Sequence, residues 1–306
     1  MISEKERFHY LLGNICKKNA SINNHPDYNV PFLFTCGMKY LKRNKHLNKE
    51  FRFFEPYWND MDMFCKNTNN IGNKFIVQFG DRPMNSAYGF SKSRKVSEKC
   101  SILLPLNTPR HWNFKFIQDE TRWESKKETI VWRGATTGRF IRRWYVNELH
   151  KSFNVKFSMI VQKKNAWISS QKIGRALSQR QLLNYKYILS LPGNDVATNL
   201  KWLMMQNSVI VMPPPKVEGW LMEGLLKPYV HFVPIHHPRN MSSVIHWMRT
   251  HDDECKKIVK NANAWIRMAK KFKPVLSWIF EYSKNKKWNQ TILHEKELQP
   301  STGFFD

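Results

Sequence analysis

The chain has 306 residues, of which 42% are hydrophobic, and its 12 Trp and 20 Phe suffice for substantial cores, which excludes disorder over most of its length. At about twice the length of a typical domain, it is expected to form two domains of similar size. The formal net charge of +26 predicts anionic partners: nucleic acid, an acidic membrane surface or phosphorylated substrates. A generally basic surface without a single patch is the alternative.

The five cysteines form no recognisable motif. They are odd in number and lack C-x-x-C spacing, which argues against a disulfide framework and a structural zinc site and favours a reducing compartment. The N-terminus "MISEKERFHYLLGNICKK" has charges where a signal peptide needs an apolar core, and no apolar run reaches the ~18–20 residues of a membrane-spanning helix. We therefore expect a cytoplasmic protein. The cysteines are Cys16, Cys36, Cys65, Cys100 and Cys255.

Residues 1 to about 50 are expected to be helical and strongly basic. Their charge run "KYLKRNKHLNKEFRF" is either a solvated helix face or an anion site. The next segment contains Asp60 and Asp62, a carboxylate pair that can hold a divalent metal against a nucleotide diphosphate. Such a pair normally closes an apolar strand, and here the preceding "FFEPYW" is interrupted by Pro56 and a charge. We therefore expect no metal site.

The segment "NKFIVQFGDRP" predicts a strand from Lys74 to Phe79. Asp81 falls at its carboxyl end, and in open α/β sheets ligands bind at that edge. The carboxylate can cap a helix, pair with Arg82 or act as a general base. Spacing alone favours the two structural roles.

A polar stretch from about residue 107 to residue 127 is expected to be a domain linker. After it, "ETIVWRGATTGRFIRRWYVNELHKSFNVKFSMIV" predicts a strand, a small-residue loop, a helix and a second strand. The first strand covers Thr129 to Arg133, and the helix covers Arg139 to His150. Arg133 and Arg139 flank the loop, where their guanidinium groups either bind phosphate oxygens or lie on the surface.

The same order of elements recurs in "NYKYILSLPGNDVATNLKWLMMQNSVIVMPPP". A strand from Tyr185 to Leu191 ends at a Pro-Gly turn, and a helix capped by Asn194 or Asp195 is expected to continue to Gln206. A second strand from Ser208 to Met212 ends at three prolines. The N-terminus of the helix, directly after the turn, is expected to bind an anion.

Two such units indicate a doubly wound nucleotide-binding domain with a parallel sheet. Neither G-x-G-x-x-G nor G-x-x-x-x-G-K-[ST] is present, so the dinucleotide fingerprint and the P-loop are missing. From Ser243 the chain is expected to be helical, with a break at Pro274 and a frayed tail after about residue 289. The basic face of these helices either contacts an anionic membrane or is solvated while the apolar face packs on its own domain. His231 is either a site residue or a buried, hydrogen-bonded histidine.

Four blocks in this order resemble glycosyltransferase family 90, which contains the Rumi-type protein O-glucosyltransferases and the fungal capsule-associated xylosyltransferases. They are "FIVQFGDRP", "VWRGATTGR", "YKYILSLPGNDVATNLKWLMMQNSVIV" and "LLKPYVHFVPI", and together they span about residues 70–255. Within the family the chain is most similar to compact cytosolic members carried by large DNA viruses of algae, which would place it in the host cytoplasm.

The resemblance implies a GT-B architecture, in which two Rossmann-type α/β domains face each other across a cleft. It implies a UDP-sugar donor, inversion at the anomeric carbon and no metal or other cofactor. Asp81 matches the catalytic base of the family, Arg133 a donor-phosphate residue and Gly193 the nucleotide-binding loop. The full expected donor set is Arg133, Gly134, Thr136, Arg139, Tyr187, Pro192, Gly193, Asn194, Asp195, Ala197, Thr198, Asn199, Lys201, Glu218 and His231.

The sequence also departs from the family pattern. Asn199 stands where the family usually has an arginine, so Lys201 or Arg139 is expected to contact the diphosphate instead. Phe232 replaces the usual tyrosine of the H-Y-x-P ending. The signal peptide and cysteine pattern of the luminal members are absent, which is consistent with a cytosolic setting.

The sequence therefore predicts an inverting transferase that moves a sugar from a UDP-sugar to a hydroxyl of a glycan or glycoprotein acceptor. Xylose is the favoured sugar, and glucose is the next candidate. Residues 1–125 are expected to form the acceptor-side domain with the base, residues 126–285 the donor domain, and residues 286–306 a tail. Peripheral contact with an anionic membrane is one explanation of the excess charge, and no nucleic-acid partner is expected. The alternatives are a basic nucleic-acid-binding protein and an inactive transferase fold that binds glycans.

Overall fold

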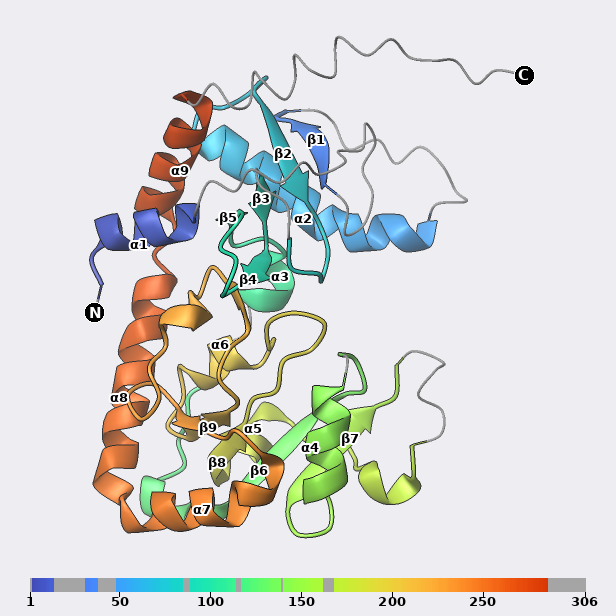
Figure 1. Cartoon of the computed structure of the whole chain (residues 1–306), viewed down its shortest axis with the longest axis vertical. Coiled ribbons are helices and arrows are strands. Elements are labelled where there is room, and N and C mark those ends of the chain that lie inside the picture. The colour runs from blue at the N-terminus through green and yellow to red at the C-terminus, as the bar shows by residue number, and fades with distance from the viewer. Residues whose placement is uncertain are drawn as a thin grey trace.

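A four-stranded sheet and a five-stranded sheet lie in opposite halves of the molecule (Figure 1). The computed structural model describes residues 2–13, 31–37, 48–84, 89–113, 117–138, 140–161 and 168–285. The helices are α1 (Glu4–Leu12), α2 (Asn48–Asn67), α3 (Thr108–His111), α4 (Ile141–Leu149), α5 (Gln179–Leu183), α6 (Leu200–Leu203), α7 (Met241–Thr250), α8 (Asp252–Ala269) and α9 (Lys273–Asn285).

The first sheet has the strand order β1 (Pro31–Thr35), β2 (Lys74–Gln78), β3 (Phe90–Ser91), β5 (Ile102–Leu103). Strand β1 runs antiparallel to β2, whereas β2, β3 and β5 are parallel. Helices α2 and α9 pack on this sheet through aromatic rings: Trp58 meets Phe34, and Phe280 meets both Phe75 and Phe90. The predicted strand at residues 74–79 is confirmed, and Asp81 follows its carboxyl end.

The second sheet is parallel throughout, as the two repeated units predicted. Its order is β11 (Val233–Pro234), β9 (Val209–Met212), β8 (Tyr185–Leu189), β6 (Lys127–Ala135), β7 (Asn154–Met159). Every residue of β9 is buried, as expected of a strand covered on both faces. The mixed α/β class is therefore confirmed.

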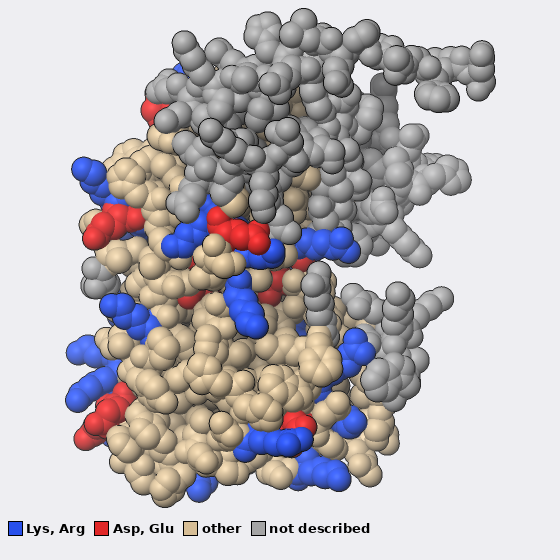
Figure 2. All heavy atoms as spheres, in the orientation of Figure 1, with Lys and Arg blue, Asp and Glu red and all other residues tan. Residues whose placement is uncertain are grey.

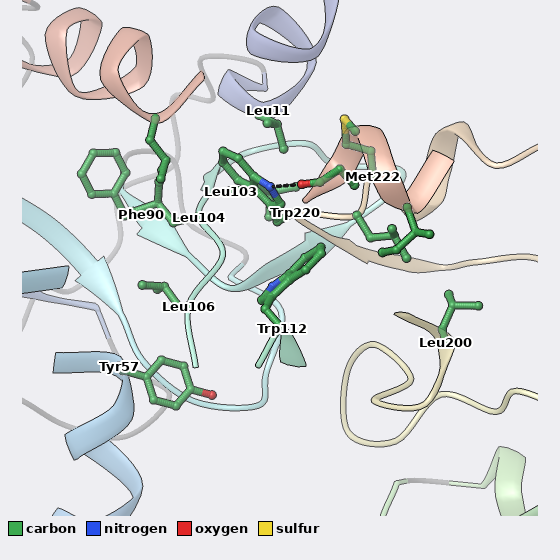
Figure 3. Packing of buried hydrophobic residues seen from close by; sticks show 14 of the residues in the cluster. Leu11, Tyr57, Phe90, Leu103, Leu104, Leu106, Trp112, Leu200, Trp220 and Met222 are labelled. Atoms are coloured by element: carbon green, nitrogen blue, oxygen red, sulfur yellow. Dashed lines mark hydrogen bonds between the residues drawn. The ribbon is translucent and has the colours of Figure 1, made fainter. Parts of the chain in front are cut away.

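The two halves are joined by a ribbon and by a shared core. Strand β4 (Ser93–Lys95) pairs antiparallel with β10 (Val217–Gly219), which links a segment beside the first sheet to one beside the second. Trp112 and Trp220 belong to one hydrophobic cluster with Phe90 of the first sheet and Leu200 of the second half (Figure 3). The indole of Trp220 donates to the carbonyl of Ala269, 2.9 Å away, at the end of α8.

Helices α8 and α9 run along one side of both halves (Figure 1). Pro274 lies in the first turn of α9, so the predicted break is confirmed. The guanidinium of Arg7 in α1 is buried and donates to three carbonyls at this break, those of Met268, Ala269 and Lys271. Carbonyls at the end of a helix lack an amide partner one turn further along, so a cation from α1 stabilises the junction.

Two expectations for the chain trace are wrong. Residues 31–35 form strand β1 rather than helix, because they alternate between buried and half-buried positions against β2. The expected linker over residues 107–127 carries buried side chains, Trp112 in one hydrophobic cluster and Trp123 in the other, and its role as a linker stays a prediction. The helix expected over residues 194–206 is reduced to the single turn α6, and neither Asn194 nor Asp195 caps it. No long helix therefore begins at the turn after β8, and the anion-binding role of the turn at Gly193 stays a prediction.

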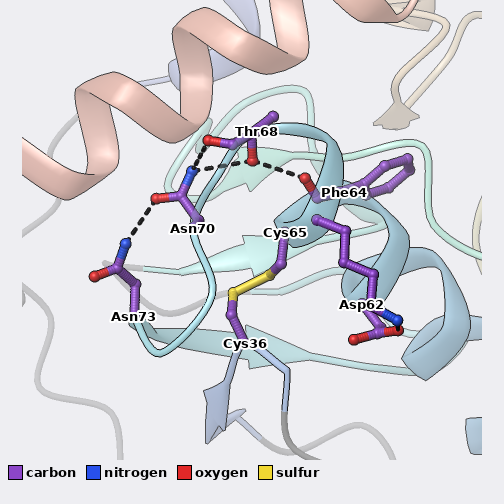
Figure 4. The surroundings of a disulfide bond; sticks show 8 residues. Cys36, Asp62, Phe64, Cys65, Thr68, Asn70 and Asn73 are labelled. Carbon is purple, nitrogen blue, oxygen red and sulfur yellow. Dashed lines mark hydrogen bonds and ion pairs between the residues drawn. A yellow bond between two sulfur atoms is a disulfide. The ribbon is translucent and has the colours of Figure 1, made fainter.

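A disulfide joins Cys36, directly after β1, to Cys65 in α2 (Figure 4). Cys100 is also disulfide-bonded, and Cys255 is a free, buried thiol. The prediction that the cysteines form no disulfides is wrong, because an odd count leaves one thiol over and says nothing about the others. The reducing compartment stays a prediction. No helix of the described chain is both long and apolar enough to cross a bilayer.

Asp60 in α2 fixes the segment that carries α3. Its carboxylate accepts hydrogen bonds from the backbone amide of Thr108 at 2.8 Å and from the Thr108 hydroxyl at 2.5 Å. Burial raises the pKa of Asp60 to about 6, although these hydrogen bonds act in the opposite direction. A carboxyl group with a raised pKa stabilises the fold below about pH 4, and this contribution is lost as the pH rises to about 6.

Asp60→Asn should remove this pH dependence, which is worth about 2–3 kcal/mol. Urea unfolding of both proteins at a series of pH values between about 4 and 7 measures it. We expect the free energy of unfolding of the wild type to fall, relative to that of the variant, as the pH rises. Parallel curves would show that Asp60 titrates normally.

Candidate functional site

A cavity of about 870 Å³ lies beyond the carboxyl ends of β8 and β9. This is the edge of a parallel sheet at which ligands bind in open α/β folds. Most of its lining comes from three segments: the start of α4, the turn after β8 and the proline run after β9. Its described lining is Phe140, Ile141, Trp144, Tyr145, Ser190, Pro192, Gly193, Asn194, Asp195, Val196, Ala197, Leu200, Met212, Pro213, Pro214, Pro215, Lys216, Val217, Glu223 and His236.

One wall of the cavity is aromatic. Phe140 is 72% exposed and stacks on Trp144, with ring centroids 6.4 Å apart. The other face of this wall is closed by His237, whose ring lies edge-on to Trp144 at 4.8 Å. An exposed aromatic ring at the mouth of a pocket offers a flat apolar surface to a nucleobase or a sugar.

The floor of the cavity is made where the two predicted glycine loops meet. The backbone amide of Gly138 donates to the side-chain oxygen of Asn194 at 3.1 Å. Gly138 has a φ of +92°, and a Cβ there would lie 2.9 Å from the carbonyl carbon of Gly193. Only glycine allows this backbone conformation together with so close an approach.

Arg142 in α4 is hydrogen-bonded to both of these loops. Its guanidinium donates to the carbonyls of Ala135, Leu191 and Pro192 and to the Thr137 hydroxyl, at 2.7–3.2 Å. Burial lowers the pKa of Arg142 to about 10. Arg142 was not predicted from the sequence, although its position one helical turn after the glycine loop was a usable signal. With its donors occupied by oxygens of the protein, Arg142 orders the floor.

Asp81 lies at the junction between this cavity and the first sheet. One carboxylate oxygen accepts from the ammonium of Lys92 and, at 3.1 Å, from the hydroxyl of Tyr57 in α2. The other accepts from the guanidinium of Arg110 in α3 at 3.0 Å. Burial alone would raise the pKa of Asp81, but the charges of Lys92 and Arg110 outweigh it and hold the pKa below its ordinary value. Asp81 is therefore ionised and oriented.

Asp195 connects Asp81 to the cavity. Its carboxylate lies 2.8 Å from the Lys92 ammonium and accepts from the Ser93 hydroxyl at 3.1 Å. It also lines the cavity. This arrangement explains why Asp195 caps no helix, since its oxygens already bind groups beside the first sheet.

Glu223 brings a second carboxylate to the cavity, which the sequence patterns did not indicate. One oxygen accepts from the Gly219 amide at 2.7 Å. The other has no hydrogen-bond partner among the described residues, and the nearest cation, the ammonium of Lys201, is 3.8 Å away. Burial raises the pKa of Glu223, and the charge of Lys201 opposes it. An acceptor in this condition suits a hydroxyl donor of a ligand.

Five of the expected donor residues line the cavity: Pro192, Gly193, Asn194, Asp195 and Ala197. Arg139 lies outside the described residues. The remaining nine are absent from the described lining: Arg133, Gly134, Thr136, Tyr187, Thr198, Asn199, Lys201, Glu218 and His231.

Most of these nine have structural partners instead. Arg133 donates to the carbonyls of Trp132, Asn154 and Arg175, so its guanidinium is directed to the outer strand β7. Thr136 exchanges hydrogen bonds with the backbone of Val161. These contacts do not favour the phosphate role for Arg133, which stays a prediction.

Glu218 and Lys201 are buried outside the described lining of the cavity. Glu218 pairs with Arg94 at 2.8 Å and accepts from the Tyr10 hydroxyl. Lys201 is 2% exposed, and its ammonium lies over the ring of Trp112. This burial does not favour Lys201 in the contact expected of the missing arginine, which stays a prediction.

Asn199, Tyr187 and His231 also serve the fold. Asn199 accepts from the Ser190 hydroxyl at 3.0 Å, which keeps the turn after β8 in place. Tyr187 is fully buried in β8. His231 accepts from the Lys227 amide at 3.0 Å with its ring against Trp265, so it is hydrogen-bonded as the structural alternative expected, but it is half-buried rather than buried.

The carboxylates of Asp60 and Asp62 have separate partners. Asp60 binds Thr108, as described above, and Asp62 pairs with Lys66 one turn later in α2 at 2.6 Å. They lie on a helix two positions apart, where side chains diverge. This geometry does not suit a shared metal ion.

The chain matches the model of Glycosyl transferase family 90 over residues 110–299. It is 34% identical over 197 residues to the O-glucosyltransferase LpsA of Dichelobacter nodosus, a match that covers 63% of this chain and 60% of that protein. It is 32% identical over 176 residues to the uncharacterized protein 179R of Invertebrate iridescent virus 6, which covers 55% of this chain and 14% of the viral protein. A shorter match, 34% over 89 residues, joins it to the uncharacterized protein 027R of Frog virus 3, covering 28% and 9%.

These matches place the protein in the class of glycosyltransferases. The chain belongs to Glycosyl transferase family 90: three of its four sequence blocks lie within the matched residues, and the first block, which contains Asp81, precedes them. It spans less than two thirds of the length of each of these three relatives.

Gly138→Ala should destabilise the protein more than Gly72→Ala. Both residues have positive φ, +92° and +84°, so both variants carry backbone strain of roughly 1–3 kcal/mol. At Gly72 nothing lies within 4 Å of a new Cβ, whereas at Gly138 the Gly193 backbone must move. Urea unfolding of the two variants measures the difference, and equal losses would mean that the two loops do not touch.

Proposed function

We propose that the protein is an inverting glycosyltransferase of the GT-B type, which moves a sugar from a UDP-sugar to a hydroxyl of a glycan or glycoprotein acceptor. One observation carries the proposal. Asp81, at the carboxyl end of a strand in the first sheet, is joined through Lys92 to Asp195 in the wall of the cavity at the second sheet. A single-displacement transfer requires a base within reach of the donor pocket, and these ion pairs connect the two.

In this mechanism Asp81 takes the proton of the acceptor hydroxyl while that oxygen attacks the anomeric carbon. General-base assistance of this kind contributes about 10²–10⁴-fold. Tyr57 and Arg110 hold the carboxylate in one orientation through its two oxygens. The sugar passes through an oxocarbenium-like transition state, as in glycoside hydrolysis.

The departing diphosphate gains negative charge, which fixed donors must stabilise. Lys216 lines the cavity, and Arg110 is half-exposed beside Asp81. The backbone around Gly138 and Gly193 supplies further N–H groups, and Arg139 follows the first loop in the sequence. One well-placed donor is worth about 3 kcal/mol in such a site. We propose that these groups act without a metal ion.

The apolar and acidic parts of the cavity fit a nucleoside. The ring of Phe140 offers a surface for the uracil, and the unbonded oxygen of Glu223 is an acceptor for a ribose hydroxyl. For the sugar itself, the name of the LpsA relative favours glucose, whereas the wider family resemblance favours xylose. UDP release from UDP-glucose and UDP-xylose, with and without candidate acceptors, distinguishes the two.

The excess positive charge does not lead us to propose a nucleic-acid function. On the face shown in Figure 2, described Lys and Arg side chains stand at separate places, with Asp and Glu side chains among them. A nucleic-acid site would gather cations along one groove. We keep peripheral contact with an anionic membrane in the proposal only for an acceptor that lies on such a membrane.

Asp81→Asn should lower kcat by about 10²–10⁴-fold and change UDP affinity far less, because the base acts on the acceptor and reaches the donor cavity only indirectly, through Lys92 and Asp195. Transfer assays and calorimetry with UDP measure the two quantities. Asp62→Asn, which changes an aspartate paired with Lys66 on the helix surface, is the matched control. Wild-type turnover of Asp81→Asn would overturn the base assignment, and loss of wild-type activity in EDTA would overturn metal independence.

A further inference from the structure

Lys92 occupies an unusual position between the two halves of the site. It lies between β3 and β4, and its side chain is 5% exposed. Its ammonium forms ion pairs with Asp81, which follows β2, and with Asp195, 2.8 Å away in the turn after β8. It also lies 5.7 Å from the centre of the Tyr57 ring. One cation is thus shared by the base candidate and by the wall of the donor cavity.

We propose that Lys92 is a positioning residue that couples the donor loop to the base: it keeps Asp81 charged and oriented, and Asp195 controls how strongly it does so. The inference rests on the proposed function of Asp81. In this proposal Lys92 contacts neither the acceptor nor the donor. It acts on the acceptor through Asp81 and on the donor through Asp195.

The charges around Asp81 support this division of roles. Facing it are Lys92, the α3 residue Arg110 and the α2 residue Tyr57, with the neutral ring of His111 buried beside both cations. Asp195 offsets part of the charge of Lys92. A buried lysine with two carboxylate partners divides its attraction between them, so a change at one carboxylate alters the other.

The coupling gives the site a way to respond to the donor. Asp195 lines the cavity, so a bound nucleotide sugar changes the surroundings of its carboxylate. Any weakening of the Asp195–Lys92 pair leaves more of the lysine charge on Asp81. Conversely, Lys92 holds the Asp195 turn in the position that shapes the cavity before the donor arrives. Base and pocket are therefore formed together.

Two substitutions should shift the titration of Asp81 in opposite directions. Lys92→Met removes an opposite charge, so the pKa of Asp81 should rise by about 1–3 units. Asp195→Asn removes a like charge and leaves Lys92 to Asp81 alone, so the pKa should fall. Carboxyl-¹³C NMR of aspartate-labelled protein without ligands measures both, with Asp81 assigned from the spectrum of Asp81→Asn.

The same variants should move the acid limb of the pH dependence of kcat/KM, measured as UDP release from UDP-glucose. We expect Lys92→Met to shift the limb to higher pH and Lys92→Arg, which keeps the charge, to restore the wild-type position. Lys95→Met, which changes an exposed lysine three residues along that pairs with Glu98, is the matched control and should leave the limb in place.

Titrations of Asp81 that do not move in either variant would overturn the coupling, even if Asp81→Asn is inactive. If the pKa of Asp81 shifts as expected in Lys92→Met and Asp195→Asn but Asp81→Asn is active, the proposed base is overturned and the coupling stands. If Lys92→Met fails to fold, Lys92→Arg and Asp195→Asn still decide: an Asp195→Asn titration that moves to higher pH contradicts the proposal.

Discussion

Buried ion pairs between the two halves are the interaction on which the site depends. Lys92 and Arg94 come from the segment beside the first sheet, and their partners Asp195 and Glu218 come from the second half. Both cations are at most 5% exposed. Breaking a buried pair by removing one partner costs about 3–5 kcal/mol, because a charge is left without compensation. The relative position of base and cavity is therefore fixed by charges that tolerate little displacement.

The two pairs differ in what they achieve. Arg94 is saturated: besides Glu218 it donates to the carbonyls of Tyr10, Leu11 and Ser101, and so it also anchors α1. Arg94 is therefore a purely structural contact. Among the described residues Lys92 pairs with two carboxylates, and one of them, Asp195, lines the cavity. The first pair holds the halves together, and the second couples the base to the donor cavity.

Local patterns in the sequence predicted the elements that position the site. The strands β2, β6, β8 and β9 follow from short apolar runs bounded by glycine or proline, and α4 from its helical spacing. The loops at Gly138 and Gly193 were expected to bind phosphate independently. Their contact with each other depends on a backbone approach that no local pattern reports.

The side chains of the site were harder to predict, because their roles depend on distant partners. Glu218 and Arg133 matched a site by position, yet Glu218 is bound by Arg94 and Arg133 by backbone carbonyls. Glu223, only five residues after Glu218, reaches the cavity instead. Which of two nearby carboxylates reaches the cavity thus depends on which buried cation lies next to each, and this depends on tertiary contacts.

Hydrogen bonds from arginines to backbone carbonyls account for part of the net charge of +26 without an anionic partner. Arg7, Arg133 and Arg142 are satisfied mainly by backbone carbonyls at a helix junction, a sheet edge and the cavity floor. A carbonyl compensates the desolvation of a guanidinium but does not cancel its charge. Each arginine used in this way therefore raises the net charge for a structural reason. The excess of basic residues is to that extent a property of how this fold satisfies its carbonyls, and a patch for a partner need not be assumed for these positions.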